Sequence, residues 1–171
     1  LEFLAAHPEY VSMLVPNMRF TMGSDPEFFA EDPQGRLIPA FQWLQDKNGG
    51  KIKVDPKSIL GLGSSALDNI TLFWDGFQAE LNAVPNFCHE QLLVSIRDHI
   101  LVMGSLLNKK YPEGRLTIRN TFNINSCDLR ALPEEFIALG CKPSFNVYGR
   151  ESLLLDGRSV ETRAAGGHIH L

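Results

Sequence analysis

The strand-like segments of this chain come in hairpin-like groups, not in strict alternation with helices. Residues 18–29 and 36–40 flank the turn signal Pro33-Gln34-Gly35, and residues 72–83 divide into two strand pieces around Asp75-Gly76. Strands joined by short turns pair antiparallel, whereas parallel pairing needs a longer crossover. The sequence therefore predicts an α+β fold with a largely antiparallel sheet backed by helices.

Residues 87–110 have the apolar spacing of an amphipathic helix, which Asn86 is expected to cap. We expect Arg97, Asp98 and Lys109 on its polar side. Its apolar positions are Leu92, Leu93, Ile96, Ile100, Met103 and Leu107. The other expected elements are a short helix within residues 1–15, a loop over 45–69, a strand over 116–124, a helix from Pro133 to Gly140 and a final strand over 159–171.

The 171 residues are enough for one domain, 1–171, and no linker or internal repeat divides them. The net charge of −4 argues against a nucleic-acid surface that depends on bulk positive potential. The sequence has neither the run of about eighteen apolar residues of a membrane-spanning helix nor the pattern of a signal peptide. Three cysteines without close pairs indicate a reducing compartment, so we expect a cytoplasmic protein.

The two ends of the chain suggest a fragment. It begins with Leu1, and it ends at Leu171 within a strand-like His-Ile-His pattern. We therefore expect the N-terminal portion of a longer chain, truncated on the C-terminal side.

Three groups of residues carry candidate chemistry. Asp25 and Glu27 lie two apart, so on a strand both carboxylates face one way, and a hard cation such as Mg²⁺ relieves their repulsion. Glu80 stands in an apolar strand, where a carboxylate is costly unless it is paired or bound to metal. Each group has an alternative interpretation. Asp25 and Glu27 could be a solvated pair at a strand edge, and Glu80 could lie on a solvent-exposed polar face of its strand.

The third group lies near the end of the chain. His168 and His170 share one strand face, and imidazole serves both as a metal ligand and as an acid–base group. Gly166-Gly167 permits close approach of backbone or ligand, and Arg163 offers a planar fork for carboxylate or phosphate. Two exposed histidines at a strand end are the alternative. Together, three carboxylates and one or two histidines suit a hard-metal site that handles phosphates.

A looser candidate is Gly49-Gly50-Lys51, which could cradle a phosphate through backbone N–H groups and the lysine. It lacks the P-loop spacing, and a solvated loop is the competing interpretation.

Taken in order, the acidic pair, Glu80-Leu81-Asn82 and Gly166-Gly167-His168-Ile169-His170 resemble the phage-type carboxylate–amine ligases, also called COOH–NH2 ligases type 2. These belong to the glutamine synthetase and glutamate–cysteine ligase superfamily. The segment Gly140-Cys141-Lys142-Pro143 is also similar to that group. Better-known branches have Glu at the position of Asp25, whose side chain is shorter by one methylene.

The resemblance implies a curved, glutamine-synthetase-like antiparallel sheet whose inner face holds ATP and two or three Mg²⁺ ions. It implies an enzyme that joins a carboxylate to an amine through an acyl phosphate, in the host cytoplasm if phage-encoded. The substrates would be a small-molecule or peptide carboxylate and an amine. From composition we expect neither a nucleic acid nor a membrane as a partner, and the oligomeric state stays open. The metal ligands would be Asp25, Glu27, Glu80 and His168, the catalytic residues Glu80, His168 and Arg163, and the cofactor contacts Lys51, Arg163 and His170.

Two other functions are compatible with these residues. One is a different metal enzyme, such as a cupin-like oxygenase or a hydrolase, although a cupin site opens with His-x-His, whereas here the histidines come last. The other is a structural or interaction fragment with an incomplete site.

Overall fold

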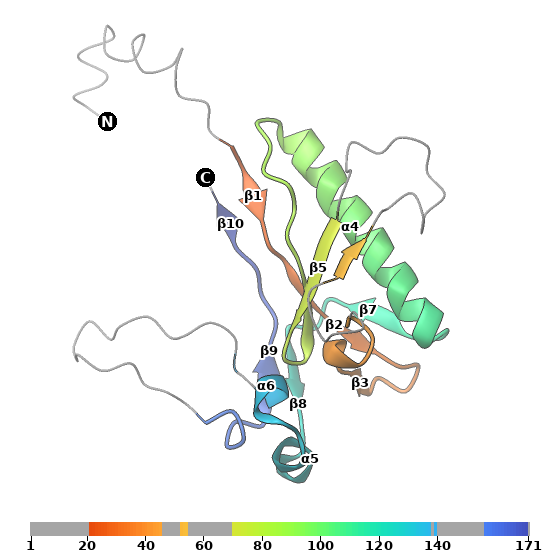
Figure 1. The fold of residues 1–171 in the computed structure, drawn as a ribbon, viewed down its shortest axis with the longest axis vertical. Helices are drawn as coiled ribbons and strands as arrows, with labels where there is room; N and C mark the ends of the chain where they lie inside the picture. The colour runs from red at the N-terminus through yellow and green to blue at the C-terminus, as the bar shows by residue number, and fades with distance from the viewer. Residues whose placement is uncertain (1–20, 46–51, 55–69, 138, 140–155, 171) are drawn as a thin grey trace, which may run out of the picture.

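The computed structural model describes residues 21–45, 52–54, 70–137, 139 and 156–170. It is a mixed α/β structure built on a curled six-stranded antiparallel sheet, with few helices (Figure 1). This confirms the predicted mixture of helices and antiparallel strands. The predicted helix within 1–15, the segment with Lys51, and Gly140-Cys141-Lys142-Pro143 lie outside the described residues.

The main sheet has the strand order β3-β2-β6-β5-β4, and β7 also pairs with β2. Two further antiparallel pairs, β1 with β10 and β8 with β9, extend it in opposite directions (Figure 1). The strands of the main sheet are β2 (Glu27–Glu31), β3 (Leu37–Ile38), β4 (Ile52–Val54), β5 (Ile70–Asp75), β6 (Gln78–Leu81) and β7 (Arg115–Thr117). The strands of the two outer pairs are β1 (Gly23–Ser24), β8 (Thr121–Asn123), β9 (Thr162–Ala164) and β10 (Ile169–His170).

Both predicted hairpins form, and local chemistry explains their turns. Between β2 and β3, the Asp32 side chain accepts hydrogen bonds from the backbone N–H groups of Gln34 and Arg36, each at 2.9 Å. Gly35 has a φ of 75°, and Gly76, between β5 and β6, has a φ of 58°. Only glycine adopts such backbone angles without steric cost. The turn residues therefore fix the register of the strands around them.

One face of the main sheet is apolar and packs against the helix α4 (His89–Lys110). Leu72, Ala79 and Leu81 project from β5 and β6 on this face and are fully buried. Val102 and Met103 of α4 belong to the same core. Figure 1 shows α4 lying along the sheet beside β5. Most of the apolar burial in the described part of the chain is therefore on this side.

The ends and faces of α4 differ from the sequence prediction in three details. Cys88, not Asn86, is the N-cap residue. The Asn86 side chain accepts a hydrogen bond from the Cys88 backbone N–H, just before the helix begins. Leu93, expected on the apolar face, is 61% exposed. Asp98, expected on the polar face, is only 5% exposed.

The opposite face of the sheet is more polar and ends in an aromatic cluster. Phe29 of β2 and Phe122 of β8 meet edge to face at 5.1 Å between ring centroids, and Phe77 contacts Phe41 at 5.6 Å. Phe41 belongs to η1 (Ala40–Gln42), a short 3-10 helix after β3. The cluster closes against α5 (Ser126–Ala131) and α6 (Glu134–Ile137) through Leu129 and Ile137.

Two predicted strands are each divided in the structure. The segment 116–124 forms β7, which pairs with β2, and β8, which pairs with β9, with the intervening Ile118 98% exposed. The segment 159–171 likewise gives β9 and β10. Sequence analysis missed α5, which Asn125 caps by accepting from the Cys127 backbone N–H at 2.8 Å. No helix among the described residues is long and apolar enough to cross a bilayer.

Candidate metal centre

Three carboxylates converge on the polar face of the main sheet. Glu27 of β2 lies directly opposite Glu80 of β6, and Asp75 lies two residues beyond Phe73, the partner of Glu80 on β5. Residues two apart on a strand share a face, so all three side chains project to the same side. One oxygen from each lies within 4.8 Å of the others, which makes these residues a group that could hold a metal ion.

The electrostatics of this group fit a cation. Burial, and then the neighbouring Glu27 carboxylate, raise the pKa of Asp75 above its ordinary value. Close carboxylates repel one another, and a bound cation removes that repulsion. Mg²⁺ and Ca²⁺ prefer carboxylate oxygens, and all three groups supply them. The donor set therefore has the chemistry of a site for a hard divalent cation.

A second polar group lies beside the first, where β1 pairs with β10. The His168 backbone N–H donates to Asp25 Oδ1 at 2.7 Å, and His170 Nε2 lies 3.1 Å from Asp25 Oδ2. The His168 ring is 3.4 Å from the same carboxylate through Nδ1. Burial alone would raise the pKa of Asp25, but hydrogen bonds from His170 and from the His168 backbone, together with the charges of the two rings, lower it.

Backbone contacts tie the two groups together. The Gly166 N–H donates to Glu27 Oε2 at 2.7 Å, and the Glu27 N–H donates to the Gly166 carbonyl at 3.0 Å. A Cβ on Gly167 would lie 2.8 Å from Pro26 Cα, closer than side chains approach a backbone. The glycines therefore let residues 166–168 run against residues 25–27. This supports the sequence interpretation that the glycines serve a close approach of backbone.

Arg163 lies elsewhere, with only 3% of its surface exposed. Its guanidinium donates to the carbonyls of Gly157 and Ile137, at 2.8 and 3.3 Å, and also to that of Val160. The guanidinium carbon lies 5.4 Å from the centre of the Phe77 ring, and burial lowers the pKa of the side chain. These contacts fasten the turn at 157–160 to α6. The predicted role of Arg163 in holding a phosphate or carboxylate remains a prediction.

The structure thus divides the predicted ligands into two neighbouring sets. Glu27 and Glu80 come together, whereas Asp25 is grouped with the two predicted histidines, His168 and His170. Asp75 was not among the predicted ligands, because the Asp75-Gly76 pair is typical of a turn. The usable signal was the hairpin register: Asp75 pairs with Gln78, which shares a face with Glu80.

No family model, curated protein or solved structure matches this chain. An interpretation of function therefore depends on the geometry of the two polar groups and on the order of the motifs in the sequence.

Proposed function

We propose that this chain carries the metal- and ATP-binding sheet of a carboxylate–amine ligase with a glutamine-synthetase-like fold. One observation carries the proposal: Glu27, Asp75 and Glu80 meet on the polar face of a curled antiparallel sheet, with ligand oxygens within 4.8 Å of one another. The other face is covered by α4 and its apolar core. The carboxylate face is therefore the side on which phosphates and metal would bind.

In this proposal Glu27, Asp75 and Glu80 hold Mg²⁺, and the Asp25 carboxylate orients the His168 and His170 rings beside it. When bound, Mg²⁺ would neutralise negative charge on the ATP phosphates. The two histidine side chains are 76% and 63% exposed, so they are accessible to a phosphate or a substrate. A neutral imidazole there could accept a proton from the attacking amine, and a protonated one could donate to a phosphate oxygen.

The proposed reaction has two bond exchanges. A substrate carboxylate oxygen bonds to the γ-phosphorus of ATP as the bond to ADP breaks, which gives an acyl phosphate. The amine nitrogen then bonds to the carbonyl carbon, and inorganic phosphate leaves as the amine loses a proton. Two negatively charged reactants meet in the first exchange, so a cation-binding group of carboxylates near the phosphate site suits it.

The same donor set weighs against the cupin-like alternative. Such a site would rest on imidazole ligands for iron, whereas the described cluster supplies only carboxylate oxygens, which suit Mg²⁺, Ca²⁺ or Mn²⁺. His168 and His170 are outside that cluster and interact with Asp25.

A thermal-shift titration with MgCl2 and ATP tests the proposal. A ligand that binds only the folded state stabilises it by about 2.7 kcal/mol at one hundred times its Kd. We expect Mg-ATP to raise the Tm of the wild-type chain and of the surface control Glu135→Gln, but not of Glu80→Gln. Glu135 lies on the exposed side of α6, so this control removes one charge away from the cluster. An equal shift in Glu80→Gln, or no shift in the wild type, would contradict the proposal.

A further inference from the structure

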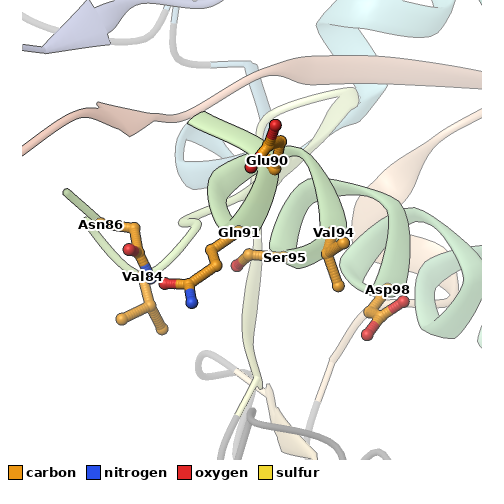
Figure 2. Close-up of a pocket in the computed structure, with 7 residues that line it drawn as sticks. All are labelled: Val84, Asn86, Glu90, Gln91, Val94, Ser95 and Asp98. Carbon is orange, nitrogen blue, oxygen red and sulfur yellow. The ribbon is translucent and has the colours of Figure 1, made fainter. Parts of the chain in front are cut away.

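A cavity of about 280 Å³ lies between α4 and the connection that leads into it from β6. Figure 2 shows its lining side chains. They are Val84, Asn86, Glu90, Gln91, Val94, Ser95 and Asp98. The proposed metal centre lies on the other face of the main sheet, so this cavity is a separate feature and nothing in the proposed function uses it.

Two buried polar groups in this cavity have unused hydrogen-bonding capacity. Ser95 is 4% exposed, and its hydroxyl oxygen has no hydrogen-bond partner among the described residues. A buried hydroxyl without a partner is unfavourable, and such groups are uncommon in folded proteins. Asp98 is 5% exposed, and Arg97 donates to it through Nε and Nη2 at 2.9 and 2.7 Å. Both of these bonds go to Oδ1, so Arg97 leaves the second carboxylate oxygen, Oδ2, unused.

The positions of these residues on α4 bring them to one side. Gln91, Ser95 and Asp98 are spaced by four and three residues, which places them along a single helix face. Figure 2 shows Gln91 and Ser95 close together, with Asp98 farther along the helix and Glu90 projecting the other way. The Glu90 carboxylate is near Cys88 Sγ, at 3.3 Å, and His89 Nε2, at 3.7 Å. Glu90 thus lines the cavity from the end nearer to these two residues.

The available groups match a primary ammonium ion. Such an ion has three N–H donors, and the Asp98 carboxylate, the Ser95 hydroxyl and the Gln91 amide oxygen can each accept one. A charged acceptor is the strongest of the three, and it selects a cation. Val84 and Val94 provide apolar walls for a short alkyl chain. The volume is at the small end for ligand pockets, which limits the ligand to a few carbon atoms.

We propose that this cavity binds a small primary alkylammonium ion, with Asp98 and Ser95 as its principal contacts. The site is independent of the metal centre, because α4 and the sheet lie between the two. Ligand binding here would tie the start of α4 to the residues that follow β6.

The test is calorimetric titration of the whole chain with n-propylammonium chloride at pH 7, compared with 1-propanol and with tetramethylammonium, which has no N–H donors. We expect saturable binding of propylammonium, at least about tenfold tighter than binding of either comparison ligand. Asp98→Asn and Ser95→Ala should each weaken binding about tenfold, while Glu135→Gln, which removes a charge from the exposed side of α6, should not.

A second readout separates ligand binding from a structural role. Alanine favours helices and removes the unpartnered hydroxyl, so Ser95→Ala should keep or raise the Tm of the chain without amine. A lower Tm for Ser95→Ala would show that the hydroxyl serves packing and would contradict the proposal. So would the absence of saturable heat up to about 10 mM propylammonium, or equal binding of tetramethylammonium.

Discussion

The two faces of the main sheet are made by alternate residues of the same strands, yet they differ in chemistry. On β6, Ala79 and Leu81 are fully buried against the α4 side, while Glu80 between them projects from the other face, half-buried. On β5, Leu72 likewise lies on the buried face, whereas Asp75 lies on the same face as Glu80. One face supplies apolar burial, and the other gathers negative charge. Stability and candidate function are thus separated across one layer of backbone.

The largest effect is expected on the apolar face. Leu81→Ala removes a fully buried side chain from the core beneath α4 and should lower the free energy of unfolding by about 2–5 kcal/mol. Urea denaturation followed by circular dichroism measures this loss. The Mg-ATP stabilisation, expressed as a free energy, should persist in the variant as long as it folds. If a folded Leu81→Ala variant lost the Mg-ATP stabilisation, metal binding on one face would depend on packing on the other, which would contradict their separation.

A smaller effect of opposite sign is expected on the carboxylate face. Asp75→Asn removes an ionised group that burial and Glu27 disfavour, so without divalent cations the variant should be at least as stable as the wild type. With Mg²⁺ at one hundred times the wild-type Kd, it should lack the stabilisation of about 2.7 kcal/mol. Tm values with EDTA and with MgCl2 test both statements. A variant that is destabilised under both conditions would make Asp75 a structural residue only.

The smallest effect is a pH dependence on the α4 side. His99 is fully buried, its Nδ1 lies 2.7 Å from the Ser95 carbonyl, and burial lowers its pKa below the ordinary 6.5. The unfolded chain therefore binds a proton more readily than the folded one does just below pH 6.5. This contribution to stability is present above pH 6.5 and is lost as the pH falls toward the lower pKa of the folded state.

Urea titrations at several pH values between about 5 and 8 measure this contribution, with His89→Gln as the control. His89 is exposed at the start of α4, so His89→Gln controls for the loss of a histidine from the surface of the same helix. His99→Gln should flatten the pH dependence. A stability that rises on acidification through this range would contradict the assignment.

Local sequence signals anticipated much of the fold. The turn residues Gly35 and Gly76, with the apolar spacing of α4, were sufficient for both hairpins and the long helix. They could not show that Asp98 is buried, because the burial of a helix position depends on tertiary packing. Nor could they show that β7 and β8 are separate strands, since that depends on two different pairing partners.

The candidate site shows the same limit. Glu27 and Glu80 were predicted from the polarity of single strands, and the antiparallel register then placed them opposite each other. Asp75 joins them only through the β5–β6 pairing. Arg163 shows the reverse: its sequence position beside the glycines suggested a ligand contact, whereas the fold surrounds it with backbone carbonyls. Which side chains meet is determined by strand register and by burial, and neither can be deduced from motif spacing alone.

The most direct test of the metal centre is Mn²⁺ binding followed by paramagnetic broadening of backbone amide signals. We expect one saturable site, with broadening strongest at Glu27, Asp75 and Glu80 and absent at Leu101 on the outer side of α4. Asp75→Asn should abolish it. Broadening centred on the exposed Glu134 and Glu135 of α6, or no saturable binding, would contradict the claim that these three carboxylates form a metal site.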